Sequence, residues 1–330
     1  MQDTSIAWCD WVWNPIRGCS RISAGCERCY AEALAARHSV ASDKRPNPPF
    51  AGFAEFRVIG GKREAHWTGK VELIESKLLE PLSWRRKALK FCAEHGRKPR
   101  AFISMSDLFH ENLPDEAIDR VFAVMGAVPE VNWMILTKRA ERMSAYGKSR
   151  RWVADGFGED SQEQYLPNVA MGVSVESQKY ADERIPHLLA TPAAMRFASY
   201  EPALEAVDWK PYISGINPHW SGRADDEVRR ERLDMIIVGG ESGPGARPFD
   251  IGWARSTVKQ CRAAGVAPFV KQMGSKPERL MSINAALELQ RFAGRNPDKP
   301  EPQYFRDRKG ENMSEWPEDL RVREWPEGWN

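Results

Sequence analysis

Three cysteines near the start of the chain constrain its fold and chemistry more than any other feature. Cys19, Cys26 and Cys29 lie within eleven positions, although the 330 residues hold only six cysteines. The two-residue gap between Cys26 and Cys29 lets both sulfurs reach one centre, and Gly18 and Gly25 permit the tight loop this requires. Three thiolates leave one coordination position of a metal centre open, which is typical of a site that performs chemistry.

The spacing alone leaves the nature of this centre open. An iron–sulfur cluster with one iron not held by protein fits three cysteines. Zinc fits if Cys9 folds back as a fourth ligand. Three unrelated core thiols are a further interpretation, but buried structural cysteines rarely gather in one loop. We therefore expect Cys19, Cys26 and Cys29 to be metal ligands, and we favour a [4Fe–4S] cluster.

The composition is that of an ordinary globular protein. A length of 330 residues, with 42% hydrophobic and 28% charged residues, suffices for one large α/β barrel or two smaller domains. No run approaches the roughly twenty apolar residues that span a bilayer, and no secretory signal pattern opens the chain. Cysteine usage is not that of a disulfide scaffold. We expect a cytoplasmic protein without a membrane partner.

Charge is distributed unevenly along the chain. The net charge is +2, but residues 1–110 hold 18 Lys and Arg against 12 Asp and Glu. A solvated face explains this excess. A surface for a phosphate-bearing substrate, such as a nucleic acid or nucleotide, explains it as well.

Strands are expected to alternate with helices along most of the chain. Ile118, Val121, Phe122 and Met125 recur at the spacing of one helical face, in a helix that opens at Pro114. Further helices are expected over Pro81–Cys92, after Lys138, over Ser177–Leu189 and over Asp250–Ala264. The expected strands are Val71–Ile74, Ala101–Met105, Trp133–Leu136, Val169–Val173, Met195–Ala198, Met235–Val238 and Phe269–Val270.

This alternation predicts an α/β fold with a parallel sheet, as a single partial or full (β/α) barrel over residues 1–274. Two irregular excursions are expected, over Pro46–Gly61 and over Gly215–Arg232, the second charged and mobile. Residues 275–330 are expected to form an extension. It repeats Glu-Trp-Pro at Glu315–Pro317 and Glu324–Pro326 and should pack on the barrel by its tryptophans.

Polar residues follow the predicted strands, at the ends where parallel α/β barrels carry their active sites. We expect catalytic or substrate-holding roles for Asp107, His110, Lys138, Glu201 and Lys271. His110 is a candidate general acid or base beside Asp107. Ser104 and Glu176 also lie at strand ends, and we expect them to bind a cofactor. The glycine-rich loop at Gly239, Gly240 and Glu241 follows a late strand and opens a helix, where backbone N–H groups hold anions.

Several motifs together resemble a known family. They are Thr-Ser-Ile-Ala-Trp, Trp-Asn-Pro-Ile-Arg-Gly-Cys, Gly-Cys-Glu-Arg-Cys-Tyr-Ala-Glu, Ser-Met-Ser-Asp-Leu-Phe-His-Glu, Leu-Thr-Lys-Arg, Gly-Val-Ser-Val-Glu, Val-Gly-Gly-Glu-Ser-Gly and Val-Lys-Gln-Met-Gly. Through these motifs the chain resembles the bacteriophage three-cysteine-motif proteins, which are radical-SAM-like. The resemblance runs from about residue 4 to 274 and again near Glu315–Pro326.

The resemblance implies a barrel of radical SAM type and a [4Fe–4S] cluster on Cys19, Cys26 and Cys29. It implies S-adenosylmethionine as the second cofactor and an electron donor as a partner. The Gly239, Gly240 and Glu241 segment matches the one that receives the methionine amine in radical SAM enzymes, where it follows an early strand. Glu75, at the end of the early predicted strand, is the alternative for that role.

Overall fold

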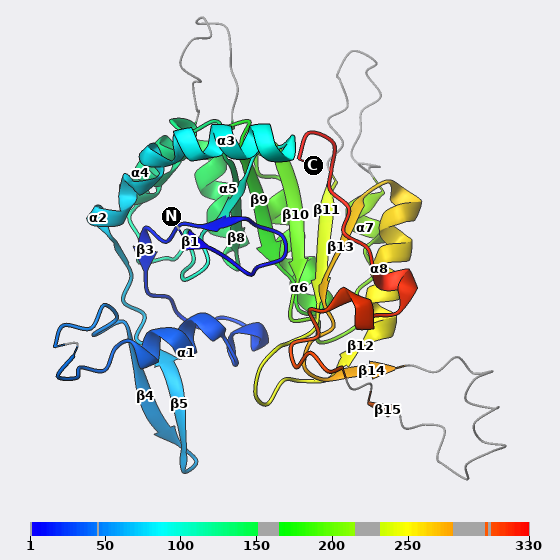
Figure 1. Cartoon of the computed structure of the whole chain (residues 1–330), viewed down its shortest axis with the longest axis horizontal. Coiled ribbons are helices and arrows are strands. Elements are labelled where there is room, and N and C mark those ends of the chain that lie inside the picture. Colours follow the sequence, from blue (N-terminus) through cyan, green and yellow to red (C-terminus); the bar gives the residue numbers. More distant parts are fainter. Residues whose placement is uncertain are drawn as a thin grey trace, which may run out of the picture. The chain divides into compact units, whose positions relative to one another are not determined.

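The computed structural model describes residues 2–44, 46–150, 165–214, 232–279, 301–302 and 305–329. The chain divides into two compact units (Figure 1). The first comprises Met1–Ser174, Glu183–Phe197 and Glu327–Asn330, and the second comprises Val175–Asp182 and Ala198–Pro326. The described residues after position 274 thus group with the second unit up to Pro326, whereas the last few return to the first.

Parallel strands form the centre of the first unit. Their order is β2 (Trp11–Val12), β7 (Arg100–Phe102), β8 (Asn132–Thr137) and β9 (Val169–Ser174), with β1 (Gln2–Asp3) antiparallel on β2. β10 (Met195–Tyr200) begins in this unit and ends in the second. Trp133 lies opposite Val169 and Thr137 opposite Val173, so the carboxyl ends of β8 and β9 meet at one edge. The predicted α/β class is confirmed.

Helices connect these strands as predicted. α4 (Asp115–Gly126) follows β7, α5 (Ala140–Ser149) follows β8, and α6 (Gln178–Leu189) follows β9. Ile118, Val121, Phe122 and Met125 of α4 are all buried, because residues three and four apart share one helical face. The amphipathic pattern therefore gave the correct helix and the correct inner face.

The region between β2 and β7 differs from the sequence prediction. The strand expected at Val71–Ile74 is only β6 (Glu72–Leu73), which pairs antiparallel with β3 (Ile16–Arg17) outside the main sheet. The excursion expected over Pro46–Gly61 contains β4 (Ala54–Ile59), which forms a hairpin with β5 (Lys62–Trp67). The remaining elements are η1 (Ala24–Cys26), α1 (Tyr30–Arg37), α2 (Glu75–Leu78), η2 (Glu80–Trp84) and α3 (Arg85–His95).

The second unit pairs β11 (Met235–Gly239) with β13 (Ala267–Gln272) in parallel, and α8 (Ile251–Ala264) connects them. Asp250 caps α8 by accepting from the N–H of Gly252 at 2.7 Å, and Gly265 ends it in the left-handed conformation. Its other elements are α7 (Lys210–Ile213), β12 (Phe249–Asp250), β14 (Pro277–Arg279), β15 (Glu301–Pro302), η3 (Met313–Glu315) and η4 (Glu318–Leu320). Most of the Gly215–Arg232 excursion lies outside the described residues.

Two tryptophans of the tail make packing contacts in the second unit. Trp316 is buried and donates its indole N–H to the carbonyl of Gly310 at 2.9 Å. Trp325 meets the ring of Phe269 on β13 edge to face, with centroids 5.7 Å apart. Among the described residues, no helix is both long and apolar enough to cross a membrane.

Close packing between β9 and β10 generates a stability prediction. A Cβ atom at Gly172 would lie 2.4 Å from Cζ of Phe197, which is fully buried. Gly172→Ala should therefore lower the free energy of unfolding by about 1–3 kcal/mol through overpacking. Chemical denaturation measures this change. Adding Phe197→Leu should cost less in the Gly172→Ala background than in the wild type, and equal costs would contradict the packing account.

Candidate functional site

The three cysteines lie on a loop and helix of the first unit. Cys19 follows β3, Cys26 ends η1, and Cys29 is the N-cap of α1. All three are free thiols. Gly18 has φ +90°, and a Cβ there would meet the carbonyl oxygen of Lys70 at 1.9 Å, so the chain can enter this loop only through glycine. The local fold thus gathers the three thiols in one short segment.

Burial and neighbouring charges set the state of these thiols. Burial, helped by the charge of Asp107, raises the pKa of Cys19 to about 12, whereas the Arg139 cation opposes the rise. Burial likewise raises the pKa of Cys29, opposed by the N–H groups of Glu32 and Ala31 and by the Lys138 cation. Burial thus favours the protonated form of Cys19 and Cys29, while the Arg139 and Lys138 cations favour any negative charge that these two thiols acquire.

The cysteine segment matches a metal centre in the chemistry of its side chains but not in their grouping. Across the part of the chain that is described, no three His, Cys, Asp or Glu side chains are grouped as a metal ion would require. The chemistry of the donor set does fit a thiolate-bound centre, because three free thiols act on one another electrostatically and cations lie beside them. Binding such a centre requires the thiols to converge further.

Cys9 has different neighbours from the three cysteines of this segment. It is buried just before β2, and its charged neighbour is Arg100. Arg100 itself donates to the carbonyl of Trp329.

A buried carboxylate ties α1 to the loop. Glu32 is 1% exposed and forms an ion pair with Arg21 at 2.6 Å. Its Oε1 also accepts from the N–H of Trp67 at 2.7 Å, and Arg21 donates to the carbonyl of Ala65 at 2.8 Å. The ion pair of Arg21 with Glu32 therefore holds the cysteine loop, α1 and β5 together. Sequence reasoning did not identify this pair.

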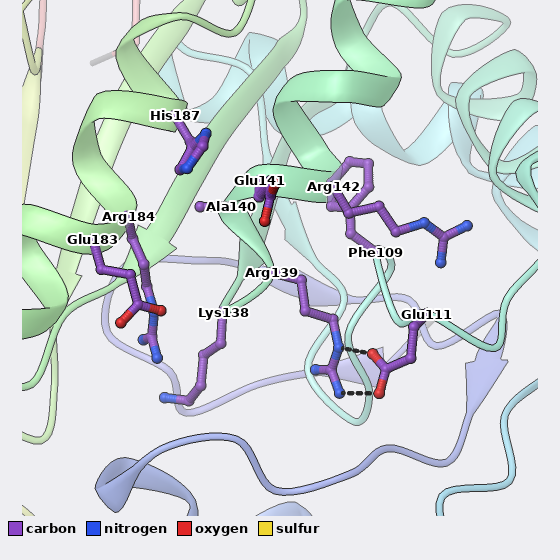
Figure 2. A pocket seen from close by; sticks show the side chains of 10 residues that line it. All are labelled: Phe109, Glu111, Lys138, Arg139, Ala140, Glu141, Arg142, Glu183, Arg184 and His187. Atoms are coloured by element: carbon purple, nitrogen blue, oxygen red, sulfur yellow. Dashed lines mark hydrogen bonds and ion pairs between the residues drawn. The ribbon is translucent and has the colours of Figure 1, made fainter.

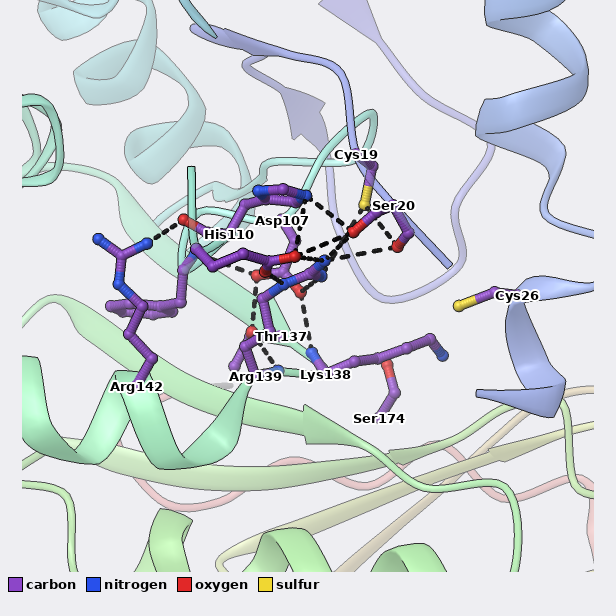
Figure 3. Close-up of polar contacts among 12 residues, drawn as sticks. Cys19, Ser20, Cys26, Asp107, His110, Thr137, Lys138, Arg139, Arg142 and Ser174 are labelled. Atoms are coloured by element: carbon purple, nitrogen blue, oxygen red, sulfur yellow. Dashed lines mark hydrogen bonds and ion pairs between the residues drawn. The ribbon is translucent and has the colours of Figure 1, made fainter. Parts of the chain in front are cut away.

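Asp107 connects the ends of β7 and β8 (Figure 3). Its Oδ1 accepts from the N–H of Phe109 at 3.0 Å and from the hydroxyl of Thr137 at 2.6 Å. Its Oδ2 accepts from the N–H of Lys138 at 3.0 Å and from Nη1 of Arg139 at 3.1 Å. Four donors satisfy this buried carboxylate. Asp107 therefore holds the ends of β7 and β8 together, and we call Asp107 with these four partners the Asp107 clamp.

Arg139 extends the Asp107 clamp to the cysteine loop. Its Nη2 donates to the hydroxyl of Ser20 at 2.6 Å, and its Nη1 lies 4.0 Å from Sγ of Cys19. Its Nε also pairs with Glu111 at 2.5 Å. Burial alone would raise the pKa of Glu111, but the bonds from Arg139 lower it to about 2. The sequence analysis did not single out Arg139 as a functional residue.

His110 is the second partner of Ser20. It is fully buried, and its Nδ1 accepts from the N–H of Asn112 at 3.1 Å, which assigns the ring proton to Nε2. Nε2 lies 2.9 Å from the Ser20 hydroxyl. Burial lowers the pKa of His110, and the Arg139 cation adds to this effect. The neutral ring therefore positions the cysteine loop.

A cavity of about 260 Å³ opens beside the Arg139–Glu111 pair, between α5 and α6 (Figure 2). Lys138, Arg184 and His187 line it together with Arg139 and Arg142. Arg142 is held by the carboxylate of Asp115 at 2.8 Å. Acidic residues of the wall are Glu111, Glu141 and Glu183. The cavity is polar and shares Arg139 with the cysteine network, so it can take a small charged ligand there.

In the second unit, the predicted residues form another polar cluster. Lys271 pairs with Glu201 at 2.6 Å, and the side-chain amide of Gln272 donates to the same carboxylate at 2.9 Å. That amide also donates to the carbonyl of Gly240 at 2.9 Å, which ties the glycine loop to β13. The sequence analysis did not single out Gln272 as a functional residue.

Glu241, the acidic residue of the glycine-rich loop, forms an ion pair with Arg247. Glu241 accepts from the backbone N–H of Arg247 at 2.8 Å and from its Nη2 at 2.7 Å. Gly239, at the end of β11, accepts from the N–H of Ala203 at 3.0 Å. Glu176 is fully buried, and its carbonyl accepts from the N–H of Leu204 at 2.9 Å.

The structure thus brings the predicted residues together in two groups. In the first unit, Cys19, Asp107, His110 and the backbone of Lys138 share one network. Ser104 has other partners, since its N–H donates to Asn14 and its carbonyl accepts from the hydroxyl of Tyr30. Glu75 takes no part in this network. It begins α2 on the surface, not the end of a sheet strand, and both its oxygens accept from Arg120.

Comparison with known proteins defines the family. A family model described as "Protein of unknown function (DUF5131)" matches residues 3–300, and the chain belongs to this family. No curated protein matches the chain. No solved structure matches it either.

The Asp107 clamp predicts unequal effects for the two acids that bind Arg139. Asp107 and Arg139 side chains are both 8% exposed, whereas Glu111 is 57% exposed. Asp107→Ala should cost about 3–5 kcal/mol of unfolding free energy because it leaves Arg139 buried without this partner. Glu111→Gln should cost less than about 1 kcal/mol. Equal losses in denaturation experiments would refute the assignment of Asp107 as the clamp.

Proposed function

We propose that this protein is an iron–sulfur enzyme of the radical SAM type, with its parallel strands forming a partial (β/α) barrel. The observation that carries the proposal is the cysteine segment itself. Three free thiols lie in one short loop and helix, with the Arg139 and Lys138 cations acting on Cys19 and Cys29. Cations beside thiolates stabilise the negative charge of a thiolate-bound centre.

Cys19, Cys26 and Cys29 are the residues that would hold the [4Fe–4S] cluster. When bound, a cluster with three thiolate ligands supplies an iron open to S-adenosylmethionine and, after reduction by an electron donor, the electron that cleaves it to a 5′-deoxyadenosyl radical. Arg139 positions the loop through Ser20, because its Nη2 bonds the Ser20 hydroxyl while Asp107 holds its Nη1.

The chain's other residues supply binding and orientation. The cavity between α5 and α6 offers Lys138 and His187 to a carboxylate or phosphate, and the exposed Glu141 and Glu183 to an amine. In the second unit, Lys271 and Gln272 fix one carboxylate, Glu201, in place. A nucleic acid or nucleotide is the proposed substrate class, supported by the basic excess of residues 1–110.

Metal analysis tests the cluster. Anaerobically prepared protein should be brown and hold about four irons per chain. Cys19→Ala, Cys26→Ala or Cys29→Ala should each remove colour and iron. The matched controls Cys9→Ala, Cys92→Ala and Cys261→Ala should keep both. One zinc per chain without iron, lost in Cys9→Ala, would establish a zinc-holding binding module instead.

Uncoupled cofactor cleavage tests the enzyme claim. With S-adenosylmethionine and a strong one-electron reductant, cluster-loaded protein should release 5′-deoxyadenosine without any further substrate, because the cleavage needs only cluster, cofactor and electron. Mass spectrometry follows the product, with Cys26→Ala as the control. Cluster-loaded protein that neither binds S-adenosylmethionine in calorimetry nor exceeds the control would rule out radical chemistry.

A further inference from the structure

The hairpin of β4 and β5 ends in a tip that exposes both aliphatic and basic side chains. It projects from the strands of the first unit beside α1 (Figure 1). The tip reads Arg57-Val58-Ile59-Gly60-Gly61-Lys62-Arg63, with three cations and no acid. Val58 is 76% exposed and Ile59 is 48% exposed. Two aliphatic side chains and three cations thus stand together at the end of a projecting element.

The register of the hairpin distributes these side chains over two faces. Val58 lies opposite Arg63, and Ile59 lies opposite Lys62. Residues directly opposite share one face of a ribbon, and successive residues point to opposite faces. Each face of the tip therefore carries one aliphatic side chain and one cation.

The base of the hairpin is held firmly. Ala54 and Trp67 bury against Ala31, Ala35 and Ala36 of α1. The N–H of Trp67 also donates to the buried Glu32 carboxylate at 2.7 Å. The hairpin is thus anchored on the helix that begins directly after Cys29, and it presents its tip from a fixed support.

We propose that this hairpin docks the protein onto double-stranded DNA by entering the major groove. That groove, about 12 Å wide and 8.5 Å deep, admits a two-stranded β-ribbon. Strands of six residues extend for about 20 Å, which exceeds the depth of the groove. A groove contacts both faces of a ribbon, so Lys62 and Arg63 reach phosphates on its two walls while Val58 and Ile59 meet apolar base edges such as thymine methyl groups.

Other partners fit the two-faced tip less well. A flat protein surface would cover one face and leave the aliphatic residue of the other exposed. A lipid bilayer would draw Lys62 and Arg63 towards hydrocarbon together with the aliphatic residues directly opposite them. The major groove of double-stranded RNA is too narrow for side chains to read. Charge and shape together therefore favour B-form DNA.

This inference deepens the proposed function, on which it rests in one respect only: that the docked DNA carries the substrate. Docking itself requires none of the cysteines. The full-length Cys26→Ala protein should therefore bind DNA as the wild type does, so that loss of the cluster and loss of DNA binding are separate results.

Fluorescence anisotropy with a labelled duplex of about 20 base pairs, at several salt concentrations, tests the docking. Lys62→Gln with Arg63→Gln should weaken binding on the order of tenfold and reduce the salt slope by about two. Val58→Ser with Ile59→Ser should weaken binding several-fold with the slope unchanged. The matched control is Leu89→Ser with Lys90→Gln, an exposed aliphatic–cation pair on α3, which should bind as the wild type does.

Folding of the variants is checked by circular dichroism, and these exposed positions should leave it unchanged. The proposal is overturned if the wild-type protein does not bind the duplex at low salt, or if both tip variants bind as tightly as the control. It is also overturned if the tip variants instead lose binding to vesicles of phosphatidylcholine and phosphatidylserine, or if the wild type binds double-stranded RNA as tightly as DNA.

Discussion

The ion pair between Asp107 and Arg139 is the interaction on which the first unit's site depends. Both side chains are buried, and the carboxylate also bonds Thr137 and the N–H of Lys138. Breaking a buried, fully bonded pair is far costlier than losing a surface pair. The clamp therefore fixes the ends of β7 and β8, and through Ser20 it fixes the start of the cysteine loop.

A second ion pair, between the partly exposed Arg21 and the buried Glu32, holds the other side of that loop. It links the loop to α1 and, through the backbone of Ala65 and Trp67, to the hairpin. Cys19 lies near the first pair, and Cys29 begins the helix that the second pair anchors. The cysteine segment is thus tied down at both ends, while Cys26 stands between them in a short 3-10 turn. This arrangement leaves the middle of the segment to adjust on binding the metal centre that we propose.

Sequence reasoning predicted the elements that depend on continuous apolar patterns. β8, β9, β11 and β13 are buried apolar runs, and α4 has a clear inner face, so their residue patterns identify them. The hairpin was missed because most of its outer residues are polar and exposed. Gly60 and Gly61, both with positive φ, are the two-residue turn signal that identifies it.

For the candidate site, the sequence predicted only the edge of the sheet at which its residues lie. Parallel strands place their carboxyl ends together, so polar residues after β7, β8 and β13 could be assigned to site edges from sequence. The hydrogen-bond partners among these residues depend on side-chain geometry. The spacing of residues in the sequence does not determine that geometry. Hence His110 was predicted as a general acid or base and Asp107 as a catalytic or substrate-holding residue, while their hydrogen bonds to Ser20, Thr137 and Arg139 come only from the structure. Arg139 and Glu32 were not singled out.

The central claim is that the three cysteines hold a cluster with one iron open to a ligand. Mössbauer spectroscopy of protein loaded with isotopically enriched iron, before and after adding S-adenosylmethionine, tests it most directly. The account predicts that one iron subsite of the cluster changes its isomer shift on addition while the others keep theirs. Spectra that are identical with and without S-adenosylmethionine, or that show four equally ligated irons, would contradict it.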